Sequence, residues 1–243
     1  MMDINPKDTG EKAAKSDKLP LEVLVRGAEK TFDNAESLFR EAELLAKAGA
    51  LARALFLHQI SLEECSKVNN IGVWSVSLIL GYEVDQKKVL DAFRRHSAKN
   101  KSNAYMLKSS EAEADAKARG DWDAAIESFK QTQDQFHEAS NHAKNASLYV
   151  DWVDEEFAAP SERITGEMLA EITKRNVEFL GYAQNGVKML RRLERSPDEV
   201  KGLLSGFVEK AEKLRAEKPD DLMEAVDSLI STFLEEGKGK LKT

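Results

Sequence analysis

The sequence predicts an all-α protein, a bundle of about five long antiparallel helices followed by two shorter C-terminal helices. Its composition is the first reason: 42% hydrophobic and 33% charged residues with only 5 prolines among 243, rich in Ala, Leu, Glu and Lys, is typical of helical proteins. The second reason is that apolar residues recur in alternating steps of three and four, as on one face of a helix. The third is that short capping segments separate these stripes.

The first helix is expected at about residues 20–48, where one apolar stripe runs without a break. The stripe consists of Leu21, Val25, Ala28, Phe32, Ala35, Phe39, Ala42 and Ala46. Gly49 ends this helix, and a second one is expected from Ala50 to about Asn70, antiparallel because the connection is so short. The apolar residues 71–84 predict a short buried helix with a turn at Gly81.

Three further long helices complete the predicted body. The third spans about residues 85–118, and the fourth begins after the N-cap Asp121 and carries an apolar stripe as far as Val150. Residues 153–163 read as a loop, and Thr165 is a suitable N-cap for a fifth helix at about residues 165–195.

The chain ends differ from this body. Residues 1–18 are polar and are expected to form a disordered tail. Residues 19–195 form the predicted helical domain. Residues 196–243 form a C-terminal extension of two shorter, more charged helices that start at Pro197 and Pro219.

Composition also limits the partners. The net charge of −7 gives no overall attraction to nucleic acid, so any contact with RNA would be local. The single cysteine, Cys65, excludes an internal disulfide. No apolar run approaches the roughly 20 residues that span a bilayer, and the N-terminus lacks the apolar centre of a signal peptide. We expect a soluble, cytoplasmic protein with no membrane partner.

The second helix carries polar residues in an otherwise apolar stretch, LFLHQISLEECSKV at 55–68. A helical wheel gives it two apolar faces, which predicts a central helix covered on both sides. On this wheel Glu63 falls in a narrow polar strip and is expected to face water, whereas Glu64 and Lys67 lie among apolar side chains. They form either an ion pair at the edge of the core or part of a buried polar site.

The third and fourth helices show similar polar lines. His96 and Asn100 share a stripe with apolar residues, with Lys99 beside them, and Lys144 lies on a polar line of the fourth helix. Buried polar groups need partners, because an unpaired one costs about 1–3 kcal/mol. The sequence therefore predicts that Glu64, Lys67 and His96 meet in one pocket, with Lys144 or Tyr149 nearby.

The order of these motifs resembles the AbiV family of bacterial abortive-infection proteins, which are grouped with the HEPN-like superfamily. The matching segments are SLEECSKV (61–68), FRRHSAKNK (93–101), KNASLYVDW (144–152) and ITGEMLAEI (164–172). The positions that match the family's motifs are Glu63, Glu64 and Lys67, then His96 and Lys99, and then Lys144, Tyr149, Val150 and Asp151. The resemblance, over about residues 25–190, implies a HEPN-like helical domain, a homodimer and a role in phage defence. It also makes Lys144, Tyr149 and Asp151 candidate binding residues.

Ribonucleases of the HEPN class share an Arg-x4–6-His motif, and this chain has one match, from Arg53 to His58. Ala54 follows the arginine, where those nucleases normally have a polar residue. In a regular helix the two side chains also point about 140° apart. Arg53 and His58 are therefore weak catalytic candidates.

Three classes of function remain open. An effector that damages RNA or stops translation would use His96 as acid or base, Lys99, Lys67 or Arg53 to hold phosphate, and Glu64 in the same pocket. A non-catalytic interaction module would instead bind a phage protein or the translation machinery, with a phage-encoded activator or inhibitor as a further candidate partner. A ferritin-type metal protein needs repeated Glu-x-x-His motifs, but Asp134-x-x-His137 occurs once, so we expect no metal or other cofactor.

Overall fold

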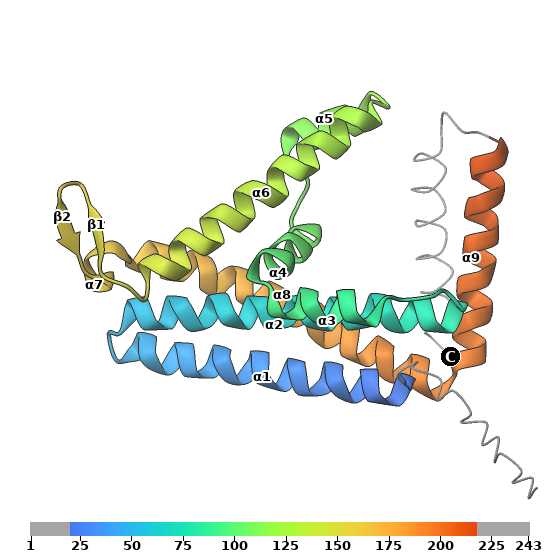
Figure 1. Cartoon of the computed structure of the whole chain (residues 1–243), viewed down its shortest axis with the longest axis horizontal. Coiled ribbons are helices and arrows are strands. Elements are labelled where there is room, and N and C mark those ends of the chain that lie inside the picture. The colour runs from blue at the N-terminus through green and yellow to red at the C-terminus, as the bar shows by residue number, and fades with distance from the viewer. Residues whose placement is uncertain (1–19, 218–243) are drawn as a thin grey trace, which may run out of the picture.

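The computed structural model describes residues 20–217, and nearly all of them are helical (Figure 1). The predicted all-α class is therefore confirmed. The elements in chain order are α1 (Leu21–Lys47), α2 (Leu51–Leu80), α3 (Gln86–Arg94), α4 (His96–Asn103), the 3-10 turn η1 (Ala104–Met106), α5 (Glu111–Ala118), α6 (Trp122–Ala146), β1 (Asp151–Val153), β2 (Glu156–Ala158), α7 (Pro160–Arg163), α8 (Gly166–Arg195) and α9 (Pro197–Glu217).

Helices α1, α2 and α8 pack against one another and form the main body of the fold. Helix α1 turns back into α2 at Gly49, whose φ of 79° is the left-handed conformation that glycine adopts without a steric penalty. The core between the three helices consists of side chains such as Leu55, Leu62, Val68 and Phe179, each at most 2% exposed. The prediction that α2 is covered on both sides is confirmed.

Helix α2 is longer than the sequence predicts, because residues 71–80 continue it without a break. Trp74 is only 2% exposed and joins the same core. The helix ends where Gly81 takes a left-handed conformation with φ of 83°. The separate short helix expected at residues 71–84 is therefore wrong, although the turn at Gly81 is correct.

The single helix predicted at residues 85–118 is also wrong. Arg95 is extended, with φ −93° and ψ 120°, and separates α3 from α4. A second break follows η1, and the Ser110 side chain starts α5 by accepting a hydrogen bond from the Glu113 backbone. Because the helix breaks at Arg95, α4 lies against both α2 and α6. Helix α3 packs against α4 (Figure 1).

Helix α6 begins as predicted, with the Asp121 side chain accepting a hydrogen bond from the Ala124 backbone, but ends earlier, at Ala146. Most of the expected loop at residues 153–163 is ordered as a two-stranded antiparallel hairpin and α7. The hairpin turns through Asp154 and Glu155, both with positive φ, 50° and 66°, as in the tight turns that suit the twist of paired strands.

Helix α8 starts after Thr165, whose side chain accepts a hydrogen bond from the Met168 backbone as predicted. Helix α9 starts at Pro197, also as predicted, and contacts α2 and α8. The helix expected from Pro219 and the N-terminal tail lie outside the described residues, and the domain division at residue 196 stays a prediction. Among residues 20–217, no helix has the length and hydrophobicity to cross a membrane.

Candidate functional site

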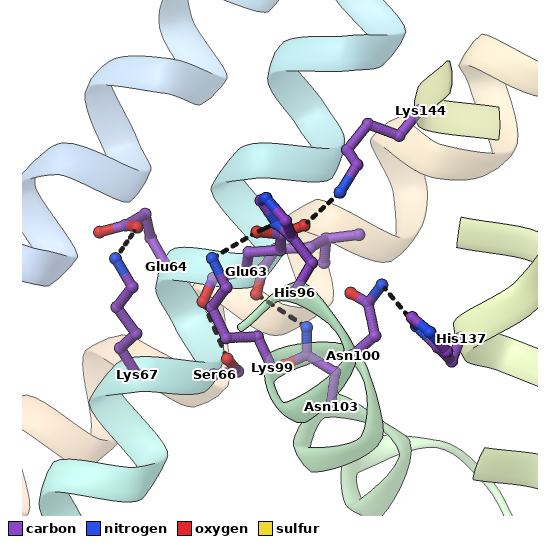
Figure 2. A network of polar contacts seen from close by, with 11 residues as sticks. Glu63, Glu64, Ser66, Lys67, His96, Lys99, Asn100, Asn103, His137 and Lys144 are labelled. Atoms are coloured by element: carbon purple, nitrogen blue, oxygen red, sulfur yellow. Dashed lines mark hydrogen bonds and ion pairs between the residues drawn. The ribbon is translucent and has the colours of Figure 1, made fainter. Parts of the chain in front are cut away.

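The most unusual feature of the molecule is the carboxylate of Glu63, which is 2% exposed and contacts two lysines and a histidine. The Nζ atom of Lys99 and the Nδ1 atom of His96 each lie 2.6 Å from Oε2. The Nζ atom of Lys144 lies 3.2 Å from Oε1. We call these four residues the Glu63 cluster (Figure 2).

Three helices assemble the Glu63 cluster. Glu63 lies mid-way along α2, Lys144 lies in the last turn of α6, and α4 carries His96 at its first residue and Lys99 one turn later. Residues three apart share a helix face, so His96 and Lys99 reach the same oxygen of Glu63. The extended Arg95 sets the start of α4 and therefore the position of both side chains.

Further polar contacts fix α4 in this position. The Asn103 side chain, fully buried, donates to the Leu62 carbonyl oxygen at 2.8 Å, and the Ser102 hydroxyl donates to Asn70 at 3.0 Å. Toward α6, the Asn100 amide lies 3.5 Å from a ring nitrogen of His137 (Figure 2). These contacts hold the backbone that presents His96 and Lys99.

Two opposing influences act on the Glu63 carboxyl. Burial is the largest and favours its neutral form, but hydrogen bonds from Lys99 and His96 and the charges of Lys99 and Lys144 outweigh it, so the pKa of Glu63 is lowered. Glu63 is therefore ionised at neutral pH and is neither a proton donor nor an effective base.

The charges of the Glu63 cluster do not balance. The Lys99 and Lys144 side chains are 8% and 9% exposed, so two nearly buried ammonium groups share one carboxylate. The His96 side chain is 53% exposed and marks the place where the cluster opens to solvent. An anion reaching this opening would meet an excess of positive charge.

The expectation that Glu63 faces water is wrong. A wheel identifies the residues that share a face, but the strip containing Glu63 is the one that α4 and α6 cover. The predicted meeting of Glu64, Lys67 and His96 in one pocket is wrong, because His96 and the nearby Lys144 contact Glu63 and neither Glu64 nor Lys67 belongs to the cluster. Glu64 instead forms a separate ion pair with Lys67, beside the cluster in Figure 2.

The comparison with known families decides the affiliation. The HEPN-class family model described as AbiV matches residues 23–181, well over half of the chain, and the four members of the Glu63 cluster lie within this range. The chain belongs to the AbiV family. It is also 70% identical over 113 residues to the uncharacterized protein y4gJ of Sinorhizobium fredii; the match covers 46% of this chain and 59% of that protein. No solved structure matches the chain.

In this AbiV-family chain, the two residues of the Arg-x4–6-His match point to different places. His58 is fully buried between α1, α2 and α8, with ring nitrogens 3.0 Å from the Thr173 hydroxyl and 3.1 Å from the Asn176 amide. Burial lowers the pKa of His58 despite the nearby Glu43. Arg53 reaches the carbonyl oxygens at the end of α6.

The last two candidates lie beyond the end of α6. Tyr149 is 58% exposed, and Asp151 begins the hairpin and pairs with Arg163 of α7 at 2.8 Å. Sequence motifs of the AbiV family singled out both, but neither forms an ion pair with a residue of the Glu63 cluster. Within residues 20–217, no three metal-ligating side chains gather as they would around a metal ion.

Proposed function

We propose that this AbiV-family protein is an abortive-infection effector that acts on RNA in the cytoplasm of the infected cell, and that the Glu63 cluster is its site. The observation that carries the proposal is the pair of nearly buried lysines beside a half-exposed histidine. Lys99 and Lys144 bring two positive charges against the single negative charge of Glu63. This arrangement suits a phosphodiester, which carries one negative charge and several hydrogen-bond acceptors.

The contact between Glu63 and His96 supports a definite role for the histidine. An ionised carboxylate accepts hydrogen bonds and cannot donate them, so Nδ1 of His96 carries the proton in this 2.6 Å contact. In a neutral imidazole the other nitrogen, Nε2, is then the acceptor. Glu63 would thus hold His96 in the tautomer that is able to take a proton from a ligand.

Metal-independent cleavage of RNA follows from these roles. Nε2 of His96 would remove the proton of a 2′-hydroxyl, and the 2′-oxygen would attack the adjacent phosphorus. The bond to the 5′-oxygen breaks, and that oxygen takes up a proton from water, which leaves a 2′,3′-cyclic phosphate and a 5′-hydroxyl. Lys99 and Lys144 would stabilise the additional negative charge that develops on the phosphate oxygens.

The surface that leads to His96 also favours a polyanion. Helix α3 and Arg95 present four exposed cationic side chains, Lys87, Lys88, Arg94 and Arg95, around an open hollow of about 520 Å³. Only Asp85 and Asp91 oppose them among the residues that line it. An acidic chain thus carries a local basic surface next to its candidate site.

RNA cleavage by the purified full chain tests this proposal. We expect the wild-type protein, with or without extract from infected cells, to cut labelled RNA to products with cyclic phosphate ends in the presence of EDTA. His96→Ala should lower the rate by 100-fold or more, about the contribution of a general base, and should abolish protection against phage. His142→Ala, a change at an exposed histidine of α6, is the matched control and should leave both unchanged.

Two results would count against the proposal. One is that His96→Ala loses phage protection only in proportion to a loss of thermal stability, as expected of a structural histidine. The other is that neither wild type nor variant cuts RNA under any of these conditions.

The exposed hairpin favours a second candidate function, that of a non-catalytic module. Trp152 and Phe157 pair across the strands with ring centroids 5.0 Å apart, yet they are 64% and 73% exposed. Exposed aromatic pairs suit a protein contact, for which a phage-encoded protein or the translation machinery is the candidate. Loss of phage protection in Trp152→Ala, without RNA cleavage by the wild type, would favour this function.

We also propose that the chain acts as a homodimer. Its long helices leave large apolar side chains in solvent, such as Val73 on α2 and Met189 on α8, 69% and 65% exposed, and burial of such surface drives association. Light scattering should give about twice 27.1 kDa at micromolar concentration, and the mass of one chain would contradict the proposal.

A further inference from the structure

A second hollow lies between η1, α5 and α6, apart from the Glu63 cluster, with a volume of about 520 Å³. It combines aromatic side chains with lysines, and no residue of the proposed chemistry lines it. We call it the Tyr105 groove.

The aromatic part of the groove is exposed. Tyr105 is 69% exposed, and its ring centroid lies 4.8 Å from that of Phe129, the two planes inclined by 49°. Ile126, one turn before Phe129 on α6, is 54% exposed. A flat apolar surface of this kind, held in place by a second ring, is suited to stacking against another planar group.

The charged part of the groove is basic. Lys108, Lys117 and Lys130 line it, and the only acidic residue among its lining is Glu113, whose side chain is 7% exposed and pairs with Lys117 at 2.7 Å. Outside the lining, Glu127 lies 4.0 Å from Lys130, in an exposed contact that contributes little. The groove is therefore positively charged overall.

The groove and the candidate site are built on the same two parts of the chain. Helix α4 carries His96 at its start and leads directly into η1, which carries Tyr105, and α6 contributes Lys144 to the site and Phe129 to the groove. At 1.5 Å per residue, the nine steps from His96 to Tyr105 span about 14 Å. A single strand of a few nucleotides is long enough to span this distance.

We propose that the Tyr105 groove binds unpaired nucleotides of RNA beside the phosphodiester that lies at His96. The bases stack on Tyr105, and the phosphates lie against Lys108 and its neighbours. This inference rests on the proposed action on RNA and adds a requirement for single-stranded RNA. A base contributes through stacking and a phosphate through charge, so the two contributions can be measured separately.

Binding is measured by fluorescence anisotropy with a labelled single-stranded RNA in the full-length His96→Ala background, so that the RNA stays intact. We expect Tyr105→Ala to weaken binding about tenfold, within the range of one lost stacking contact. An abasic strand of equal length should bind the His96→Ala protein equally well with and without Tyr105→Ala. Tyr182→Ala removes another exposed tyrosine, 46% exposed on α8, and should have no effect.

The contribution of the lysines to RNA binding is tested by measuring how affinity depends on salt concentration. Lys108→Gln should reduce the slope of log affinity against log salt concentration by about 0.7, as for one lost phosphate contact on a single strand. Lys30→Gln, a change at an exposed lysine of α1, is the matched control and should keep the slope.

Three results would overturn the proposal: unchanged affinity in Tyr105→Ala, an equal loss on the abasic strand, or an equal loss in Tyr182→Ala. Unchanged RNA affinity together with weaker binding of a protein partner would make the groove a protein-docking site and would also overturn it. Binding does not depend on cleavage, so the two proposals can fail separately. If Tyr105→Ala binds RNA about tenfold more weakly but the wild-type protein cuts no RNA, the groove is supported as an RNA-binding site and the proposed nuclease activity is refuted.

Discussion

Replacing Glu63 by glutamine would remove one negative charge from a site where two ammonium groups are almost buried. The Lys99 and Lys144 side chains are 8% and 9% exposed, and Glu63 is the carboxylate that both contact. Breaking a buried ion pair by removing one partner costs about 3–5 kcal/mol, because the other charge stays buried without compensation. Against a typical total stability of about 5–15 kcal/mol, this is a large loss.

The expected result can be measured by thermal and urea denaturation followed by circular dichroism at neutral pH. For a chain of this length, 1 kcal/mol corresponds to about 2–4 °C, so Glu63→Gln should lower the melting temperature by roughly 6–20 °C. Glu64→Gln changes the next residue, whose ion pair with Lys67 has side chains 11% and 22% exposed. This control should cost less than Glu63→Gln, because it leaves one partly exposed cation without its carboxylate, whereas Glu63→Gln leaves two that are almost buried.

A second variant separates charge from packing. In Glu63→Gln/Lys99→Met one buried cation is gone together with the carboxylate, so the double variant should be more stable than Glu63→Gln alone. If Glu63→Gln and Glu64→Gln lose the same stability, or if the double variant is the least stable of the three, the charge argument is refuted.

The dependence of stability on pH in acid gives an independent check that the pKa of Glu63 is lowered. Because the folded pKa of Glu63 lies below its ordinary value of 4.5, its contribution is complete above that value and is lost as the pH falls through the folded pKa. The stability difference between wild type and Glu63→Gln should therefore be largest near neutral pH and shrink in acid. A difference that grows on acidification would contradict the lowered pKa.

Three further predictions concern other parts of the fold. Burial and, to a lesser extent, the charge of Glu64 raise the pKa of the Cys65 thiol to about 12, so Cys65 should react with a thiol reagent at pH 8 only after denaturation; rapid labelling of the native chain would contradict this. Glu155→Gly should raise stability by up to about 1 kcal/mol in urea denaturation, because φ at Glu155 is positive; a loss would show that the turn is not strained. Asn176→Ala should cost about 1–3 kcal/mol, because fully buried Asn176 bonds to His58 and Ser61; melting at the wild-type temperature would contradict that role.

Much of the fold could be predicted because its helices carry local signals. The apolar stripe of α1, the caps at Asp121 and Thr165, and the turn at Gly81 all lie within the segments that they shape. The hairpin was missed because its turn uses Asp154 and Glu155, whereas such turns usually contain glycine or asparagine.

The candidate site was predicted only in part. His96 was singled out because it interrupts an apolar line, Lys99 because it lies beside that line, and Lys144 because it lies on a polar line of the fourth helix. Glu63 was placed in water because a central helix has no solvent side by which to orient its wheel. The motif of paired glutamates in the AbiV family was the signal that could have indicated Glu63.

The sequence by itself determined the helical class, several helix ends and the identity of the two lysines and the histidine of the Glu63 cluster, because periodicity and capping act within a few residues of one segment. Tertiary structure decided which glutamate the two lysines and the histidine contact, and where the third predicted helix breaks. No glycine or proline marks the break at Arg95. It allows Asn103 to reach the Leu62 carbonyl of α2, and His96 and Lys99 to reach Glu63. Those contacts join residues more than thirty positions apart, and their free energy arises only when α2, α4 and α6 are packed together.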